Sequence, residues 1–220
     1  MIHGDIGTTP KSRKNHKALT PHTPYITQWS GEREPEFTLI ERPGRGIGYL
    51  NETLTDRDDQ GVLWFRTPNR PAHGEPLFAR VHPLRQRRAM RRLLCNVCAN
   101  PADHTADGTL WLLRDFRDDW PGWPENVGAI EPPICVPCVR LSTRLCPALR
   151  RGAVAVRVRR APIAGVRGAL HSRGPSSEPH PTDDITVTYD DPRARWVRAI
   201  NLVRQLQECT LIDPADLCRN

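Results

Sequence analysis

Cys95-Asn96-Val97-Cys98 and Cys135-Val136-Pro137-Cys138 are the two stretches that decide the fold of this chain. Each is a C-x-x-C turn, which lets two thiolates reach one metal ion from the same short loop. Two such turns supply the four tetrahedral sulfur ligands of a closed structural zinc site. The sequence therefore predicts one structural zinc ion, with the ligands Cys95, Cys98, Cys135 and Cys138.

Residues 99–134 separate the two pairs, and this gap of 36 residues exceeds the roughly 12–20 of a compact zinc finger. The extra length costs little because loop-closure entropy grows only logarithmically, but it implies that the segment carries structure of its own. A redox dithiol is the alternative interpretation. It would follow a strand in a thioredoxin-like βαβ unit, and neither pair does. Cys146 could replace one ligand, although a small buried hydrophobic residue is the expected role.

The composition limits the class of protein. Hydrophobic residues make up 38% of the 220, beside 22 prolines and 15 glycines, so we expect a lean core, long ordered loops and disordered ends. No apolar run approaches the 18 residues of a membrane span. The basic N-terminus has no apolar stretch behind it and is not a secretory signal. Seven cysteines, an odd number, then fit a reducing cytoplasm, which is the expected location.

The chain is basic, with a formal net charge of +7. Of its 32 basic residues only three are lysine, namely Lys11, Lys14 and Lys17, and the rest are arginine. A GC-rich genome explains such a bias, because its codons favour Arg, Ala, Pro and Gly. Selection for phosphate recognition is the more specific explanation, since the planar guanidinium group of arginine can donate two hydrogen bonds to one phosphate.

We predict a disordered basic leader over residues 1–34 and one α+β zinc-stabilised domain over residues 35–220. Residues 35–94 would hold a small sheet and an arginine-rich helix, residues 95–150 the zinc module, and residues 151–220 the C-terminal strands and helix. Alternating or β-branched apolar runs bounded by turn residues predict strands. The first three, expected to form one small antiparallel sheet packed on the zinc module, are residues 37–40, 46–50 and 62–65.

Residues 83–94 are predicted to form a helix that leads directly into Cys95, because Pro83 is well tolerated at the first helical position. At 100° per residue, one side of this helix is expected to be apolar and the other to consist of arginine. The apolar side holds Gln86, Ala89, Met90, Leu93 and Leu94. The outer side holds Arg85, Arg87, Arg88, Arg91 and Arg92.

The rest of the chain alternates predicted strands, loops and helices. Asp191 and Pro192 are typical of a helix start, and a helix to about Glu208 would bury the stripe Trp196, Ile200, Val203 and Leu206. A short helix after the second cysteine pair is expected over residues 139–145. Strands are predicted at residues 109–113, 152–170 and 185–189, with loops at residues 114–126 and 172–181.

The segment around the cysteines resembles the treble-clef/HNH superfamily. Asp103-His104 follows the first pair and Glu125-Asn126 precedes the second, as in the family's C-x-x-C, D-H, N, C-x-x-C order. The resemblance implies a treble-clef-like module with four cysteine ligands, and in HNH nucleases it would make His104 the general base beside a second metal ion. After Cys138 the chain reads Val139-Arg140-Leu141, where an active member places Asn or His. We therefore expect His104 to be a solvent-exposed loop residue without a catalytic role.

Charge segregation favours a zinc-stabilised, non-catalytic nucleic-acid-binding or accessory protein whose partner is DNA or RNA. Residues 80–92 hold six arginines and residues 139–173 hold nine, with no acid in either, whereas residues 95–135 hold seven acids and two arginines. Two basic zones flanking one zinc site could track phosphates. The residues expected to contact them are Arg85, Arg88, Arg91 and Arg92.

Two other functions stay open. A protein–protein adapter is the first, because the loop with Phe116, Trp120 and Trp123 could dock a partner, and exposed tryptophan is enriched at interfaces. An enzyme is the second, either an HNH nuclease or a nucleobase deaminase. For the deaminase, His73-Gly74-Glu75 and the second C-x-x-C imitate the family's H-x-E and C-x-x-C elements.

Overall fold

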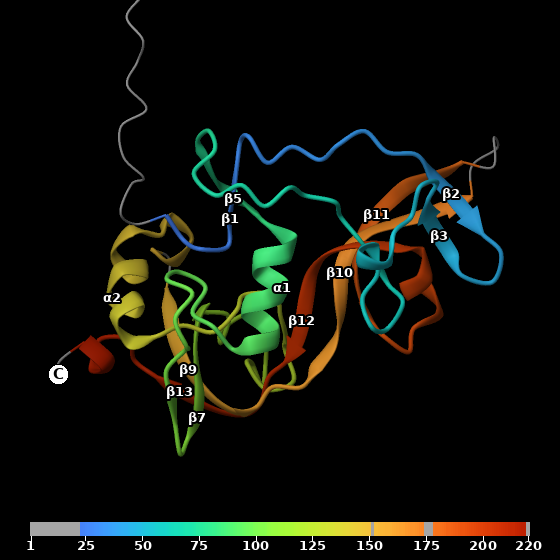
Figure 1. The fold of residues 1–220 in the computed structure, drawn as a ribbon. Helices are drawn as coiled ribbons and strands as arrows, with labels where there is room; N and C mark the ends of the chain where they lie inside the picture. The colour runs from blue at the N-terminus through green and yellow to red at the C-terminus, as the bar shows by residue number, and fades with distance from the viewer. Residues whose placement is uncertain (1–22, 151, 174–177, 219–220) are drawn as a thin grey trace, which may run out of the picture.

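The computed structural model describes residues 23–150, 152–173 and 178–218 (Figure 1). Within these residues the fold is mixed α+β, with two α-helices, α1 (Pro83–Arg92) and α2 (Val136–Leu145), and four small sheets. The predicted α+β class is therefore confirmed. No helix in the described part is long and apolar enough to cross a membrane.

A bent two-stranded ribbon joins the two larger sheets. Strand β9 (Ala153–Arg160) pairs antiparallel with β13 (Gln207–Ile212), and their continuations β10 (Ile163–Arg173) and β12 (Val197–Gln205) pair antiparallel in the next sheet. The bend comes at Pro162, whose carbonyl accepts a hydrogen bond of 3.0 Å from the backbone N–H of Gln205. Residues 153–173 and 197–212 therefore each contribute one strand to both of the larger sheets.

The first of these sheets positions the cysteines. Its strand order is β13-β9-β7-β6, where β7 is Gly108–Arg114 and β6 is His104–Thr105. Side chains alternate between the faces of a strand, so Leu110 and Leu112 pack in the same cluster as Cys95 and Cys138. The opposite face forms a second hydrophobic cluster around Trp111, Leu113, Val154, Val156 and Val158.

The second sheet carries helix α1. Its order is β11-β10-β12-β4, with β8 pairing β12, and the outer strands are β11 (Pro179–Thr188), β4 (Leu63–Trp64) and β8 (Gly128–Ala129). The helix packs on β12 (Figure 1). Gln86, fully buried, donates to the carbonyls of Leu202 (2.9 Å) and Ile130 (2.8 Å) and accepts from the backbone N–H of Leu202. This amide fixes the rotation of α1 about its axis.

The predicted C-terminal helix is wrong. Asp191 does cap a turn, since its carboxylate accepts from the backbone N–H of Arg193, but the turn is a short 3-10 helix, Pro192–Trp196, followed by strands β12 and β13. β12 lies between β10 and β4, so its backbone forms hydrogen bonds along both edges. Its side chains are buried on both faces. The buried polar residues Arg198 and Asn201 interrupt the apolar residues of β12, so the remaining apolar positions fit a helical period by chance.

Other strands differ from the prediction in pairing or extent. Strands β2 (Leu39–Arg42) and β3 (Gly46–Tyr49) form the expected antiparallel hairpin, but β4 joins β12 in parallel instead. Gly46 is required at the hairpin turn, because its φ is +77° and an added Cβ would lie 2.0 Å from the Arg195 carbonyl oxygen. The single strand predicted at residues 152–170 is the two strands β9 and β10, and β10 and β11 extend into the loop predicted at residues 172–181.

Secondary structure begins earlier than the domain boundary predicted at residue 35. Strand β1 (Thr27–Trp29) pairs antiparallel with β5 (Pro76–Val81), and the backbone N–H of Tyr25 donates to the carbonyl of Val97 between the first two cysteines. Residues 23–34 are therefore part of the folded structure. Residues 1–22 of the predicted leader lie outside the described residues.

A buried ion pair connects this N-terminal segment to α1. Glu32 is fully buried. Its carboxylate accepts hydrogen bonds from both Nη atoms of Arg85, at 2.6 and 2.7 Å, and from the backbone N–H groups of Trp29 and Arg70. Burial alone would raise the pKa of Glu32, but these hydrogen bonds, first that of Arg85, hold it below its ordinary value. The prediction that Arg85 belongs to the exposed arginine face is thus incorrect, because its side chain is only 2% exposed.

Replacing Arg85 by alanine should destabilise the fold strongly. The change leaves the Glu32 carboxylate buried without its partner, which typically costs about 3 kcal/mol or more of unfolding free energy. Arg92→Ala is the matched control, since it removes an exposed arginine of the same helix and should change stability by less than about 0.5 kcal/mol. Chemical denaturation of both variants measures the difference, and equal midpoints would contradict the role given to this ion pair.

Candidate metal centre

The four predicted cysteines meet at one point. Their Sγ atoms all lie within 4.8 Å of one another, and the Sγ atoms of Cys98 and Cys135 are 3.7 Å apart. A tetrahedral site with metal–sulfur bonds of about 2.3 Å has sulfur–sulfur edges of about 3.8 Å, whereas a disulfide would need about 2.05 Å. The four-cysteine group can therefore hold a metal ion, and all four thiols are free to do so.

The first pair sits on a tight turn directly after α1. The helix ends at Leu93 in the left-handed conformation, φ 50°, which turns the chain toward the site. The backbone N–H of Cys95 donates to the carbonyl of Asn100 (2.7 Å), and the N–H of Ala99 donates back to the carbonyl of Cys95 (2.9 Å). Ala99 is also left-handed, at φ 61°. The turn is closed by backbone hydrogen bonds, so Cys95 and Cys98 point to the same side.

The second pair begins helix α2. Cys135 is the N-cap residue, Pro137 lies in the first turn, and the backbone N–H of Cys138 donates to the Cys135 carbonyl at 3.0 Å. The predicted short helix is confirmed, but it starts at Val136 instead of residue 139. Thiolates at this position gain from the positive end of the helix dipole.

Backbone contacts hold the two pairs in register. The N–H of Asn96 donates to the carbonyl of Pro133 (3.0 Å), and the N–H of Asp103 donates to the carbonyl of Ile134 (3.1 Å). The N–H of Ile134 in turn donates to Leu110 on strand β7 (2.9 Å). Pro133 and Ile134 thus lie between the turn of the first cysteine pair and strand β7. The 36 residues between the two pairs therefore bring the second pair back beside the first.

Burial divides the four thiols into an inner and an outer pair. Cys95 and Cys138 are buried, Cys135 is half-buried and Cys98 is exposed. Burial raises the pKa of Cys135 to about 11 and that of Cys138 further, because a thiolate loses its hydration there. For Cys98 burial is outweighed by hydrogen bonds, first from the backbone of Asn100, and its pKa is lowered. A cation among the sulfur atoms offsets the cost of ionising the inner thiols.

The residues that carry the HNH resemblance are not brought together as a second metal site. His104 is exposed on strand β6, with its Nδ1 atom 3.0 Å from the hydroxyl of Thr109. Asp103 forms an ion pair with Arg157, and the Glu125 carboxylate accepts the backbone N–H groups of Glu208 and Cys209. Over the described residues, the four-cysteine group is the only cluster of three or more His, Cys, Asp or Glu that could hold a metal ion.

His73 and Glu75, the residues of the deaminase pattern, lie in the turn between Arg70 and β5 and form hydrogen bonds there. The carbonyl of His73 accepts the backbone N–H of Gly31 (3.0 Å), and the N–H of Glu75 donates to the hydroxyl of Ser30 (2.9 Å). The His73 side chain is exposed and does not belong to the four-cysteine group. These contacts give the motif a structural role.

Three of the four arginines predicted to bind nucleic acid share the exposed face of α1. Arg88, Arg91 and Arg92 are exposed, whereas Arg85 is buried as described above. Arg88 donates to the hydroxyl of Tyr25 (3.1 Å), and Arg91 forms an exposed ion pair with Asp59. The face is therefore narrower than predicted but remains basic.

The loop of residues 114–126 is less available to a partner than its sequence indicates. Trp123 is 8% exposed, and Phe116 packs edge-on against it at 6.5 Å between ring centroids. Trp120 alone of the three predicted docking aromatics is largely exposed, at 58%. Two of these rings thus belong to the core.

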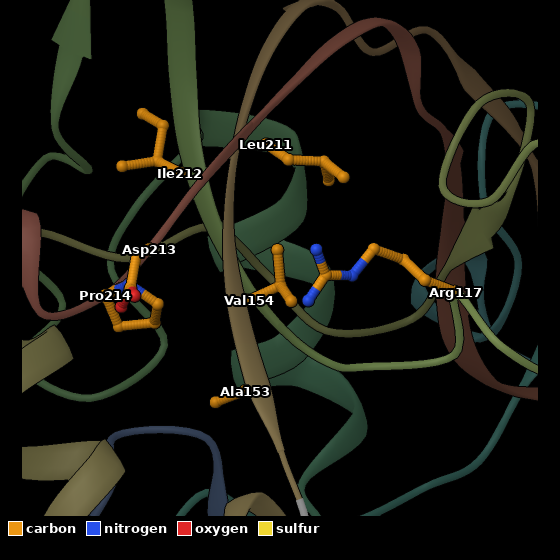
Figure 2. Close-up of a pocket in the computed structure, with 7 residues that line it drawn as sticks. All are labelled: Arg117, Ala153, Val154, Leu211, Ile212, Asp213 and Pro214. Carbon is orange, nitrogen blue, oxygen red and sulfur yellow. The ribbon is translucent and has the colours of Figure 1, made fainter.

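A small pocket opens near this loop at the ends of β9 and β13 (Figure 2). It measures about 240 Å³, and the side chain of Arg117 reaches over it toward Val154. The guanidinium is held by Asp115 through Nη2 (2.6 Å) and Nε (3.0 Å), and Asp213 also lines the pocket. The cation is therefore already neutralised by carboxylates and does not form an anion site.

No protein-family model matches this chain, and neither the curated proteins nor the solved structures compared with it contain a significant match. Function must therefore be inferred from the metal centre and the surface of the molecule itself.

Removing an inner cysteine should release the metal. Cys95→Ser and Cys138→Ser each take away one of four thiolates from a buried position, so both variants should lose the bound ion and the order of the central module. Cys209→Ser is the control, because this half-buried cysteine lies outside the group. Elemental analysis of protein purified under reductant should give one equivalent for the parent and the control. Less than about half an equivalent in the parent would contradict the site.

His104→Ala should leave the protein unchanged. The imidazole is exposed and contacts a hydroxyl of its own hairpin, so the melting temperature and the metal content are expected to match those of the parent. A DNA cleavage assay with Mg²⁺ or Mn²⁺ provides the second readout. Cleavage by the parent that disappears in this variant would instead support the nuclease.

Proposed function

We propose that the four-cysteine group holds one structural zinc ion and that the surrounding module is treble-clef-like. Four thiolates without an open position are typical of structural zinc, and soft sulfur ligands select zinc, copper(I) or iron. The order of elements supports the treble clef: a cysteine turn, the β6–β7 hairpin, and a second pair at the start of α2. Elemental analysis distinguishes zinc from iron in the same measurement as the stoichiometry.

We further propose that the protein is a zinc-stabilised, non-catalytic nucleic-acid-binding protein. The exposed face of α1 is the observation that carries this proposal. It presents Arg88, Arg91 and Arg92 along one side of a helix that contains no acidic residue. Guanidinium groups spaced along one rigid helix face suit the phosphates of a nucleic-acid backbone.

The rigidity of α1 distinguishes this face from an ordinary solvated arginine surface. The ion pair to Glu32 anchors the helix on one side, Gln86 anchors it to β12, and its C-terminus leads into Cys95. Many other arginines are held by acids, but among the described residues neither Arg88 nor Arg92 forms an ion pair. Their charges are therefore available to an anionic partner, and the exposed Arg91–Asp59 pair competes only weakly.

Changing Arg88 and Arg92 together to alanine should weaken nucleic-acid binding about equally for all sequences. Removing one phosphate contact lowers the slope of log K against log salt by roughly 0.9 on duplex DNA, so the slope should fall by up to about two. The matched control is Arg193→Ala with Arg195→Ala, which removes the same charge from exposed positions in the 3-10 helix before β12.

Gel-shift titrations at several salt concentrations measure both effects, and thermal melts check that the variants fold. Equal slopes for the two double variants would show that the α1 face is not the binding surface.

A protein–protein adapter is the second candidate, and Trp120 is the observation that favours it. This ring is largely exposed, while the rings beside it are packed. Exposed tryptophan contributes strongly where it enters a partner's pocket. If the parent protein binds neither DNA nor RNA at low salt, the adapter becomes the better proposal and Trp120→Ala the variant to test.

A further inference from the structure

The metal centre has one face toward the solvent. Cys98 is exposed and Cys135 is half-buried, and their Sγ atoms lie 3.7 Å apart, although the residues are 37 positions apart in the sequence. The other two ligands lie beneath them, with Cys95 at 0% and Cys138 at 8% exposure, packed against Leu110, Leu112 and Val139. A small molecule arriving from solvent therefore meets one cysteine of each C-x-x-C turn.

We infer that Cys98 and Cys135 form a reversible oxidation site, where a peroxide links the two outer thiolates as a disulfide and the metal ion is released. This inference rests on the proposed occupancy of the four-cysteine group by zinc. Zinc itself does not change its oxidation state, so the electrons come from sulfur.

The chemistry balances with one peroxide per site. The Cys98 thiolate attacks one peroxide oxygen, the O–O bond breaks, and a sulfenic acid forms with loss of hydroxide. The Cys135 thiolate then attacks that sulfur, forming the S–S bond and expelling a second hydroxide. Two thiolates thus lose two electrons, hydrogen peroxide gains them, and two protons taken up from the buffer convert the two hydroxides to water. Zn²⁺ leaves because only two thiolates remain.

The geometry favours this pairing over a bridge within either turn. Closing the gap from 3.7 Å to about 2.05 Å needs only a small movement of two outer side chains. Cys135 is the N-cap, in an extended conformation with φ −95° and ψ 154°, and its side chain makes no capping hydrogen bond, so it can turn without loss of a helical bond. A bridge within a turn would instead require Cys95 or Cys138 to leave the packed cluster.

The new bridge would also keep the module together. It would link the turn after α1 to the start of α2, the same two segments that the metal joins. Oxidation would therefore exchange one cross-link for another, and a thiol reductant with zinc should restore the original state.

The test treats the reduced, zinc-loaded protein with hydrogen peroxide and follows zinc with a colorimetric chelator while peptides are mapped by mass spectrometry. The expected result is release of about one zinc per chain together with a Cys98–Cys135 cross-linked peptide, both reversed by dithiothreitol and added zinc. Cys146→Ser and Cys209→Ser should behave like the parent, since neither cysteine belongs to the group.

Cys98→His and Cys135→His are the decisive variants, because imidazole can replace a thiolate as a zinc ligand but cannot form a disulfide. Either variant that keeps zinc should release it at least tenfold more slowly under peroxide. Release from the parent through a different linkage, release without any disulfide, or retention of zinc would each overturn the oxidation site. A reduced parent that contains no zinc before peroxide is added would instead contradict the proposed metal, and the oxidation site with it.

Discussion

The convergence of four sulfur atoms within 4.8 Å is the constraint on which the centre of this structure depends. Polar, ionisable groups packed this closely and partly buried are costly to charge unless a cation lies among them. Around this point lie the end of α1, the segment before α2, strand β7 and the N-terminal residues that contact Val97. Backbone hydrogen bonds and one hydrophobic cluster already join these parts, and the four-cysteine group, which could hold a metal ion, lies where they meet.

Helix α1 couples this centre to the second sheet. It is fixed by a charged contact to Glu32, by the Gln86 amide against β12, and by covalent continuation into Cys95. These three contacts differ in physical kind: an ion pair, amide hydrogen bonds and a covalent link. A short helix in water would be marginal alone. Here tertiary contacts hold the helix, and its exposed arginines lie on the side away from β12.

Local chemistry made part of this fold predictable. The cysteine spacing, Pro83 at the start of α1, and the apolar run of β7 after the turn at Asp107-Gly108 are signals carried by neighbouring residues, and the structure agrees with each. The errors come from long-range contacts. Arg85 has the same helical phase as an outer residue, but Glu32, 53 positions away, provides a buried partner. The segment after Asp191 is a strand because β10 and β4 lie on either side of it.

The bent ribbon has a consequence for how the chain folds. β12 and β13 come last in the sequence among the strands, yet they pair with β10 and β9, which lie well before them in the chain, and together they contribute to both large sheets. Contacts of high sequence separation form slowly, because loop-closure entropy is lost before they are made. While the chain emerges from the ribosome, β7 can pair with β9 and β11 with β10, but the other edges of β9 and β10 stay unpaired until residues 197–212 arrive. These two unpaired edges are therefore the parts of the incomplete chain that are most open to pairing with another molecule.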